Sequence, residues 1–414
     1  MADPRRSPLA RHGRLSSPGL AIAVLRVVAI GLCVVLVAGV SLAAIALNRL
    51  DGNVQARATA LPGDSATDIP EIGPYSGAVN LLLLGSDSRN GQKGRYGENP
   101  GSTLNDVNIL VHISEDHTKA TVISLPRDLY VSRPSCANPS DPSQKLPGAT
   151  GVKINSILEY GGLGCVRDTV ADLTGLKIPF AALISFDGVV EMSNAVGGVP
   201  VCVAKRIDDD YTGLHLSAGE HTLQGVTALK FLRTRHGVGD GSDLTRISSQ
   251  QVFLSSLVRK MKSTSTLTDV TKLYGLASAA TESMSLSSGL ANIDTLVSIG
   301  RAVAGIPLAQ FVLVQYPTQL YGDGLVPNEK PAETLMTAVK ADKTLRLAKK
   351  QTGATDGSGS VTKGDATSSP APSDSSSPSP SATSSSDTVD LPSTVVGQTV
   401  QQETCSVGNT LGRR

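Results

Sequence analysis

The sequence contains no tryptophan, and phenylalanine and tyrosine together make up only 3% of its 414 residues. Its charges nearly cancel, with 37 Lys and Arg against 36 Asp and Glu, and the two signs are interleaved along the chain. A nucleic-acid-binding surface needs a basic patch or stripe, so this balance argues against such a partner. The hydrophobic core must be built from Val, Leu, Ile and Ala, and any bound sugar must be held by polar groups instead of tryptophan stacking.

Several catalytic signatures are also missing. The sequence has no Walker phosphate-binding loop, no G-x-S-x-G nucleophile elbow and no H-E-x-x-H zinc motif. Its Cys and His residues do not have zinc-ligand spacing, and it shows no internal repeat. Nucleotide and protease chemistry therefore have no sequence support.

Residues 27–48 form a stretch of 22 residues without a charged side chain, bounded by Arg26 and Arg49. About 20 apolar residues cross the hydrocarbon core of a membrane, so we expect one transmembrane helix here. The basic segment 1–26 should stay cytoplasmic, which places all later residues outside the cell membrane. A cleaved signal peptide is the alternative, because A-x-A spacing follows, but its apolar core usually has only about 7–15 residues.

The two ends of the chain differ in composition from its middle and leave one foldable domain, expected at 76–350. Residues 49–75 are rich in small residues, Asp and Pro and indicate an extracytoplasmic stalk. Residues 351–394 contain a Ser/Pro-rich run and are predicted to be a disordered linker. The tail 395–414 regains apolar residues, and it either docks on the domain or is a loose end.

Four cysteines, Cys136, Cys165, Cys202 and Cys405, lie outside the membrane, where disulfides can persist. Four cysteines allow three pairings. We favour Cys136 with Cys165, because both lie in loop-like sequence that flanks one short helical region, and this leaves Cys202 to pair with Cys405. Free thiols are the alternative.

The pattern of apolar residues predicts an α/β (α+β) fold with a mixed central β-sheet and helices on its faces. Residues 79–84 are almost wholly apolar and suit a strand buried on both sides. Strands are also expected at 107–114 and 120–125, joined by a polar turn as a hairpin. Helical patterns at 163–174, 187–195, 222–231 and 247–262 alternate with apolar runs at 181–186, 199–203 and 306–315.

Polar residues follow the first buried strand in the sequence Gly85-Ser86-Asp87-Ser88-Arg89. Open α/β sheets usually bind ligands at the carboxyl ends of their strands, so Asp87 and Arg89 are candidate site residues. A solvated turn with an Asx hydrogen bond explains the same sequence equally well.

Asp106 comes just before the strand 107–114, and Arg127 follows the strand 120–125. The start of one hairpin strand lies beside the end of the next, so Asp106 and Arg127 should be neighbours. An ordinary salt bridge at the end of the sheet is the alternative interpretation.

Three arginines, Arg233, Arg235 and Arg246, occur within 14 residues around a Gly-rich loop. Asp243, Arg246 and Gln250 share one helical face by their i, i+3, i+7 spacing, and the other side of that helix is apolar. Guanidinium groups stay charged and donate bidentate hydrogen bonds, so their clustering favours a bound phosphate. A solvated charged face is the alternative.

Arginines that hold phosphate and isolated acids that hold a divalent cation are typical of phosphoryl transfer. Mg²⁺ commonly takes one or two carboxylates together with substrate phosphate oxygens, so Asp87 and Asp106 would suffice as ligands for Mg²⁺ or Mn²⁺. Asp106 acting as a general base is an alternative that the sequence leaves open.

The order of these motifs resembles that of the LytR-CpsA-Psr family over about residues 79–262. The motifs are G-S-D-S-R, N-D-V-N-I-L, S-L-P-R-D, K-I-N-S, R-T-R-H and D-L-T-R-I-S-S-Q-Q, behind one N-terminal span. Members of the family ligate glycopolymers such as wall teichoic acid, capsule or arabinogalactan to peptidoglycan. They cleave a polyprenyl pyrophosphate and form a phosphodiester. The Arg-, Ala- and Gly-rich composition indicates an actinobacterial, high-GC source.

The resemblance implies a membrane-anchored, Mg²⁺-dependent phosphotransferase of cell-wall assembly, with a polyprenyl-pyrophosphate-linked glycan as donor and peptidoglycan as acceptor. It implies that Asp87 and Asp106 bind the metal, and that Asp106, Arg127 and Arg246 take part in catalysis. The pyrophosphate site that it implies consists of Arg127, Lys153, Arg233, Arg235, Asp243, Arg246 and Gln250. The many aliphatic residues are compatible with an apolar groove for the lipid, and equally with an ordinary hydrophobic core.

The sequence departs from the family pattern at Leu104, where members often have Arg two residues before the acid that matches Asp106. Arg89 or Arg95 could supply that cation. Two other functions stay open, namely hydrolysis of the lipid pyrophosphate and a non-catalytic envelope receptor or transcriptional attenuator. The expected location and the lack of a helix-turn-helix signal argue against direct DNA binding.

Overall fold

In the computed structural model, the described residues are 58–59, 77–88, 101, 103–263, 284–291, 293–351, 359–363 and 387–411. The expected cytoplasmic tail and membrane span lie outside these ranges, and so do most of the expected stalk, Arg89 and Arg95. Within the described ranges, no helix is long and apolar enough to cross a membrane.

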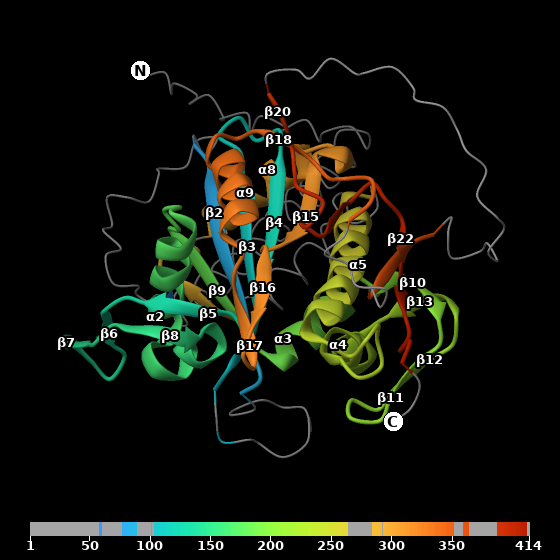
Figure 1. The fold of residues 1–414 in the computed structure, drawn as a ribbon, viewed down its shortest axis with the longest axis horizontal. Coiled ribbons are helices and arrows are strands. Elements are labelled where there is room, and N and C mark those ends of the chain that lie inside the picture. Colours follow the sequence, from blue (N-terminus) through green and yellow to red (C-terminus); the bar gives the residue numbers. More distant parts are fainter. Residues whose placement is uncertain are drawn as a thin grey trace, which may run out of the picture. The chain divides into compact units, whose positions relative to one another are not determined.

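A mixed β-sheet forms the centre of the described part of the chain (Figure 1). In order across the sheet, its strands are β1 (Ala58–Thr59), β14 (Met284–Ser287), β9 (Phe180–Ile184), β2 (Val79–Ser86), β3 (Asn105–Ile113), β4 (Ala120–Leu125), β15 (Phe311–Gln315) and β21 (Gly397–Thr399). The pairs β2–β3 and β3–β4 are antiparallel, whereas β2–β9 and β4–β15 are parallel. This confirms the expected mixed sheet and its central hairpin.

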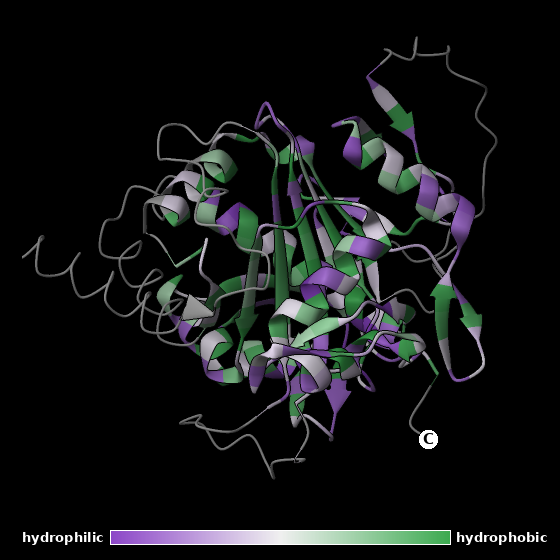
Figure 2. Ribbon diagram, turned by 90° about the vertical axis from the view of Figure 1, so that its left-hand side faces the viewer, coloured by the Kyte–Doolittle hydropathy of each residue, from purple (hydrophilic) through white to green (hydrophobic). Residues whose placement is uncertain are grey.

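Helices cover both faces of this sheet. α2 and α9 pack on the face that buries Leu82 and Leu84, whereas α5 and α8 pack on the face that carries Leu81 and Leu83. The run Leu81–Leu84 of β2 is apolar because alternate residues point into two different cores. Figure 2 shows the central strands mostly in the hydrophobic colour. The helices are α2 (Ile157–Thr174), α3 (Phe186–Ala195), α4 (Gly225–Arg233), α5 (Asp243–Lys262), α8 (Ile293–Gly305) and α9 (Glu329–Lys340), with 3-10 turns η2 (Ile154–Ser156) and η3 (Leu308–Gln310).

A second sheet holds the C-terminal segment against the domain. Its strands are β13 (Gly219–Leu223), β10 (Val199–Lys205), β22 (Thr404–Val407) and β19 (Ser360–Thr362). β22 runs parallel to β10, with Cys202 and Cys405 opposite each other and joined by a disulfide. A further disulfide joins Cys136 and Cys165. Both pairings that the sequence favoured are present, and the tail docks on the domain.

Two-stranded ribbons extend from this framework. In the described residues they are β5 (Tyr130–Arg133) with β8 (Ala149–Lys153), β6 (Cys136–Asn138) with β7 (Asp141–Leu146), β11 (Ile207–Asp209) with β12 (Leu214–Leu216), β16 (Thr318–Tyr321) with β17 (Gly324–Pro327), and β18 (Thr344–Arg346) with β20 (Thr388–Asp390). None of these ribbons was expected from the sequence.

The stalk expected at 49–75 and the linker expected at 351–394 each include residues that form strands. β1 falls inside the stalk range and pairs with β14, while β19 and β20 fall inside the linker range and pair with β22 and β18. These strands have only two or three residues, and their partners are distant in the sequence, so no local apolar period could indicate them. The Ser/Pro-rich run itself lies outside the described residues.

Two helix boundaries differ from the expected ones for identifiable reasons. α5 begins at Asp243 and not at 247, because Ser242 caps it by accepting a hydrogen bond from the Thr245 N–H at 3.3 Å. α4 begins at Gly225 and not at 222, because residues 219–223 form β13 on the second sheet. The earlier start of α5 matters most, since it places Asp243 in the first helical turn.

Candidate active site

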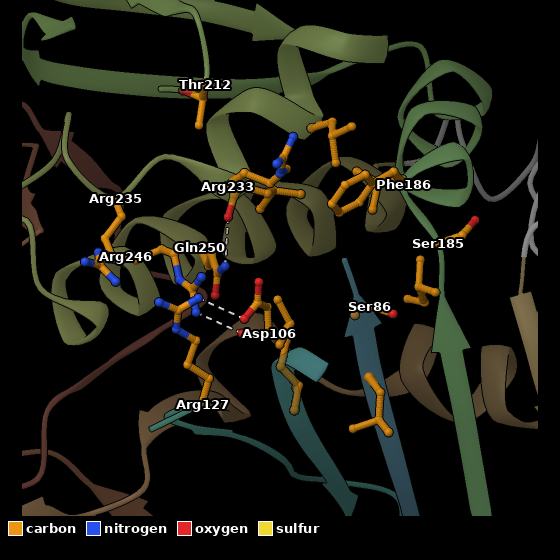
Figure 3. A pocket seen from close by; sticks show the side chains of 18 of the residues that line it. Ser86, Asp106, Arg127, Ser185, Phe186, Thr212, Arg233, Arg235, Arg246 and Gln250 are labelled. Atoms are coloured by element: carbon orange, nitrogen blue, oxygen red, sulfur yellow. Dashed lines mark hydrogen bonds and ion pairs between the residues drawn. The ribbon is translucent and has the colours of Figure 1, made fainter. Parts of the chain in front are cut away.

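A cavity of about 420 Å³ lies between the central sheet and helices α3, α4 and α5. Its apolar lining consists of Leu83, Leu84, Val107, Ile109, Ile184, Phe186, Val189, Leu229, Leu232 and Leu254. Its polar lining consists of Ser86, Asp106, Arg127, Ser185, Asp209, Tyr211, Thr212, Arg233, Arg235, His236, Arg246 and Gln250. Figure 3 shows Arg127, Arg235 and Arg246 gathered on one side of the cavity and Phe186 on the other, with Arg233 between them. An apolar surface therefore adjoins a cationic one.

Asp106 reaches this cavity at an irregular point of strand β3. Gly85 pairs with Val107 and Ser86 pairs with Asn105, so Asp106 is the extra residue of a β-bulge. Bulges re-aim a side chain and occur frequently beside active sites. A Cβ on Gly85 would lie 3.0 Å from the Val107 Cβ, so glycine at this position lets the two strands pack closely.

Arg127 follows β4, and its Nη1 donates a hydrogen bond to Asp106 Oδ1 at 2.9 Å. The neighbourhood of these two residues, expected from the hairpin, is confirmed. Burial by itself lowers the pKa of Arg127, but the carboxylates of Asp106, Asp243 and Asp128 outweigh it and raise that pKa above its ordinary value. Arg127 therefore remains a cation at the cavity.

Arg246 is held from two sides. Its Nη2 forms an ion pair with Asp243 Oδ1 at 2.5 Å and donates to the backbone oxygen of Asp106 at 2.8 Å. Asp243 also accepts a hydrogen bond from the Arg127 N–H at 3.4 Å. Burial raises the pKa of the Asp243 carboxyl, and Arg246 and Arg127 oppose this rise. Asp243 thus positions both arginines, although it does not itself line the 420 Å³ cavity.

Three arginine atoms at the cavity lack the partner that a buried donor normally has. The Nε atoms of Arg127, Arg235 and Arg246 are buried without a hydrogen bond in the described structure. The carboxylates of Asp128 and Asp243 lie 3.5 and 3.7 Å from Arg127 Nε, and neither makes a hydrogen bond with it. An unsatisfied buried donor costs about 1–3 kcal/mol, and more if charged. An anion with several oxygens can satisfy such donors.

Gln250 and Arg233 complete the cationic side. Gln250 Nε2 donates to the Leu232 backbone oxygen at 2.8 Å, and the Arg233 guanidinium lies 4.4 Å from the centroid of the Phe186 ring. The latter contact places a cation over an aromatic face at the point where the cationic and apolar linings meet. Five of the residues implied for the pyrophosphate site, Arg127, Arg233, Arg235, Arg246 and Gln250, therefore line one cavity together with Asp106.

Asp209 is a cavity residue that the sequence analysis missed. It is only 2% exposed, and its Oδ2 accepts hydrogen bonds from Thr234 Oγ1 at 2.5 Å and from the Arg235 and Gly237 N–H groups at 3.2 and 3.3 Å. Its Oδ1 accepts from the Tyr211 N–H at 3.0 Å. Asp209 therefore joins the loop that carries Arg235 to the β11–β12 ribbon.

Other predicted site residues lie outside the cavity lining. Asp87 Oδ1 accepts a hydrogen bond from the Leu104 N–H at 2.9 Å. Lys153 Nζ donates to Asp323 Oδ2 at 2.8 Å and lies 3.9 Å from Asp128 Oδ1, so it reaches the site only through the neighbour of Arg127. Leu104 therefore contacts Asp87 through its backbone, and neither residue lines the cavity.

The donor set for a divalent cation is partly assembled. Asp106 lines the cavity, and the Asp87 N–H donates to the Leu104 oxygen at 3.2 Å, which brings its backbone beside the residue two positions before Asp106. One or two carboxylates with phosphate oxygens are the usual Mg²⁺ environment, and Asp106 offers one such carboxylate at the cavity. Among the described residues, a three-ligand group is formed by Asp208, Asp210 and His215, which do not line the cavity.

An α/β domain with an apolar cavity beside clustered arginines belongs to the class of proteins that can bind an amphiphilic ligand with an anionic head. The chain is a member of the LytR_cpsA_psr family, whose model matches residues 50–344.

Relatives of known sequence agree with this membership. The chain is 32% identical over 242 residues to the cell wall biosynthesis protein LcpA of Corynebacterium glutamicum, covering 51% of this chain and 45% of LcpA. It is 30% identical over 209 residues to the polyisoprenyl-teichoic acid–peptidoglycan teichoic acid transferase TagT of Bacillus subtilis, covering 49% of this chain and 59% of TagT. The chain thus spans about half the length of these relatives.

Solved structures show the same fold. A Streptococcus agalactiae protein superposes with a TM-score of 0.51 at 22% identity, covering 64% of this chain and 88% of that one. The structure "TagT bound to LI-WTA" superposes with a TM-score of 0.50 at 22% identity, covering 69% and 98%. At these identities the likeness concerns the fold alone.

Proposed function

We propose that this protein transfers a glycopolymer from a polyprenyl-pyrophosphate carrier to peptidoglycan. The observation that carries the proposal is the set of buried arginine Nε atoms without partners beside an apolar cavity. A polyprenyl pyrophosphate has both complementary parts, since it joins an aliphatic chain to two adjacent phosphates. The names of LcpA and TagT, relatives from cell-wall assembly, support the same assignment.

In this proposal the prenyl chain lies against the leucines of β2 and α4, and the pyrophosphate accepts hydrogen bonds from Arg127, Arg235 and Arg246. A hydroxyl of peptidoglycan attacks the phosphorus that carries the glycan. A new P–O bond forms as the P–O–P bridge breaks, and prenyl phosphate leaves. The arginines stabilise the charge that develops on the bridging oxygen, which is the main way in which such sites accelerate phosphoryl transfer.

The two acids that line the cavity, Asp106 and Asp209, differ in how many hydrogen bonds their carboxylates already accept. Both oxygens of Asp209 accept hydrogen bonds from N–H or hydroxyl donors of the chain, whereas Asp106 accepts one from Arg127 through Oδ1. Asp106 is therefore our candidate for receiving the hydroxyl proton or, together with Asp87, for holding Mg²⁺ or Mn²⁺. The ion, when bound, would neutralise part of the phosphate charge.

The test is product analysis with the full-length protein in detergent, a lipid-pyrophosphate glycan, peptidoglycan and Mg²⁺. We expect glycan linked to peptidoglycan by a phosphodiester, and loss of product on chelation. Arg235→Ala should lower product formation strongly, whereas the matched control Arg346→Ala, an exposed arginine paired with Asp390 on β20, should not. Free glycan phosphate would indicate a hydrolase, and an inert folded protein would refute the proposal.

We also propose that residues 27–48 anchor the protein in the cell membrane with the domain outside. The support is their length without charge and the basic segment before them. Full-length protein should sediment with membranes after alkaline washing, and a version that lacks residues 1–48 should stay in the supernatant. Recovery of both in the supernatant would contradict the anchor.

A further inference from the structure

One exposed aromatic side chain lies at the cavity without a role in the proposed transfer. Tyr211 follows β11 and is 84% exposed, yet it is among the residues that line the cavity. Its ring lies against the His236 ring, with 4.4 Å between the ring centroids and 32° between the ring planes. His236 also lines the cavity, one residue after Arg235. Two rings in contact therefore adjoin Arg235, one of the arginines that we propose to bind the phosphates.

The backbone under both rings is held firmly, although the rings themselves are exposed. Asp209 accepts from the Tyr211 N–H on one carboxylate oxygen and from the Arg235 and Gly237 N–H groups on the other. On the opposite side, Asn409 Nδ2 donates to the His236 backbone oxygen at 2.6 Å. One buried carboxylate thus fixes the spacing between the aromatic pair and the arginine loop. A preorganised surface binds with a smaller entropy cost than a mobile one.

We propose that Tyr211 and His236 form a sugar-binding platform, on which the pyranose ring attached to the pyrophosphate stacks. The inference rests on the proposed function, because a ligand bound by Arg235 continues into a sugar where the phosphates end. The face of an aromatic ring carries negative charge and attracts the weakly positive C–H groups of a pyranose. Thr212, which also lines the cavity, adds a hydroxyl next to this platform.

This assignment changes the expectation that polar groups alone would hold a sugar in a chain without tryptophan. Tyr321 provides the comparison, since it is 64% exposed but lies on the β16–β17 ribbon and does not line the cavity. Exposure of a tyrosine is therefore not sufficient for the proposed role. The position of Tyr211 beside Arg235 and its stacking on His236 distinguish it.

The experiment measures dissociation constants by calorimetry for the full-length protein in detergent. The probes are farnesyl pyrophosphate, farnesyl pyrophosphate bearing one N-acetylhexosamine, and a peptidoglycan disaccharide. Tyr211→Ala should weaken binding of the sugar-bearing pyrophosphate by roughly tenfold, near the upper end of what an aromatic contact contributes, and change that of farnesyl pyrophosphate less than about twofold. Tyr211→Phe should retain wild-type affinity, and so should the control Tyr321→Ala.

The three probes distinguish a platform for the donor sugar from the other possible results. A loss confined to the disaccharide would overturn the proposal that the donor sugar stacks on these rings, and would place the acceptor there instead. Equal losses for both pyrophosphates, or no loss for any sugar-bearing probe, would overturn the platform while leaving the proposed function intact. If wild-type protein fails to bind farnesyl pyrophosphate, the proposed function falls and the platform falls with it.

Discussion

Strand β3 carries a polar cluster at each end, and the two clusters differ in how their buried groups are paired. At its start, beside Asp106, three arginine Nε atoms are buried without hydrogen bonds. At its end, His112 is 5% exposed, and its ring nitrogens lie 2.7 Å from Asn80 Oδ1 and 2.8 Å from Asp342 Oδ1. The first cluster borders a cavity, whereas the second joins elements of the fold.

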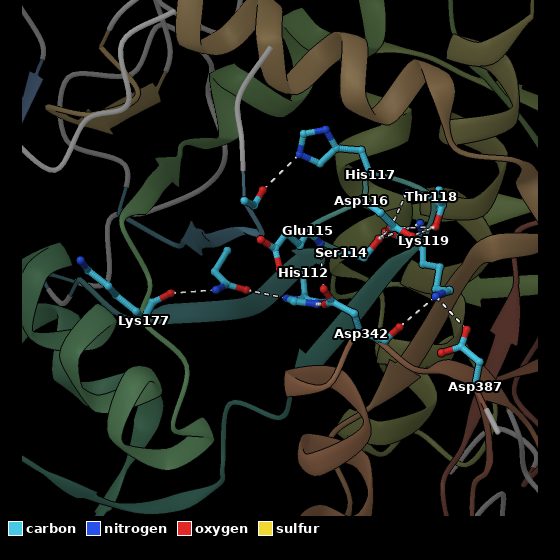
Figure 4. A network of polar contacts seen from close by, with 12 residues as sticks. His112, Ser114, Glu115, Asp116, His117, Thr118, Lys119, Lys177, Asp342 and Asp387 are labelled. Atoms are coloured by element: carbon cyan, nitrogen blue, oxygen red, sulfur yellow. Dashed lines mark hydrogen bonds and ion pairs between the residues drawn. The ribbon is translucent and has the colours of Figure 1, made fainter. Parts of the chain in front are cut away.

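The network around His112 continues across several elements (Figure 4). Asn80 Nδ2 donates to the Lys177 oxygen at 2.8 Å, and Asp342 Oδ2 accepts from the Glu115 N–H at 2.8 Å. Lys119 Nζ donates to the Asp342 backbone oxygen at 3.0 Å. A histidine beside an aspartate could suggest catalysis, but here both residues connect the sheet to the segment after α9. The buried groups around His112 are paired within the protein, whereas the three arginine Nε atoms at the cavity are not.

The largest expected effect is the loss of transfer when Arg127 is removed. This variant tests the polar cluster at the start of β3, beside the cavity. Arg127→Ala should lower the initial rate of transfer by about 10²–10³-fold, because one charge-stabilising donor of a reaction site typically contributes that much. Arg127→Lys should recover only part, since it keeps the charge but not the planar fork. Wild-type turnover by a folded Arg127→Ala protein would end the assignment of this cavity as the active site.

Removing His112 should have the opposite profile. His112→Ala should lower the free energy of unfolding by about 2–3 kcal/mol, because Asn80 and Asp342 would lose a buried partner. The transfer rate per folded molecule should stay within about twofold of wild type. Urea unfolding gives the first quantity. The control His221→Ala removes a half-buried histidine on β13 that contacts the Ser217 backbone oxygen, and should change stability by less than about 1 kcal/mol. A rate that falls with unchanged stability would reverse the roles of the two ends.

Arg235→Ala should have a smaller effect, on the stabilisation of the protein by bound ligand, and it tests whether the unpaired arginines serve a ligand or the fold. Removing a buried donor without a partner should leave the unfolding free energy of the ligand-free protein unchanged or higher. Farnesyl pyrophosphate at about 100 times its dissociation constant should stabilise wild type by about 2.7 kcal/mol, and tenfold weaker binding would reduce this by about 1.4 kcal/mol. Thermal unfolding with and without ligand measures both. A ligand-free variant that is clearly destabilised would show that Arg235 has a structural role.

The strands and the contacts at the cavity end of β3 could be predicted from the sequence where the local pattern of apolar residues is strong. The short apolar runs of β2 and β4 are too continuous for one face of a helix and therefore indicate buried strands. The hairpin of β3 and β4 then places Asp106 beside Arg127. The i, i+3 spacing of Asp243 and Arg246 on one helix gives their ion pair in the same way. These contacts follow from short-range geometry alone.

The missed residues depend on contacts between distant parts of the chain. Asp209 lies in a run of three aspartates, and only the folded loop at 234–237 selects it over its neighbours. The His112–Asp342 contact joins positions 230 residues apart. Helices α8 and α9, which cover opposite faces of the sheet, follow no motif that the family resemblance contains. A single sequence has no signal for such long-range selection.

Lys153 should show the smallest effect on transfer, and it tests where the cationic site ends. Its hydrogen bond, with a contribution from Tyr130, lowers the pKa of Asp323 to about 2 from an ordinary value of 3.8. A lowered carboxyl pKa means that the pairing stabilises the fold above about pH 4 and is lost as the pH falls through about 2. Lys153→Met should raise the Asp323 pKa towards its ordinary value, as measured by NMR titration of the carboxyl carbon.

The same variant should change the transfer rate by less than about fivefold, because Lys153 does not line the cavity and its ion pair with Asp323, which is 78% exposed, is weak. The family resemblance implies the contrary, since it counts Lys153 among the pyrophosphate-binding residues. A loss of transfer as large as that of Arg127→Ala, with an Asp323 pKa that does not move, would show that Lys153 leaves Asp323 and binds the pyrophosphate when the substrate is present. The cationic side of the site would then extend past Asp128 to the β16–β17 ribbon.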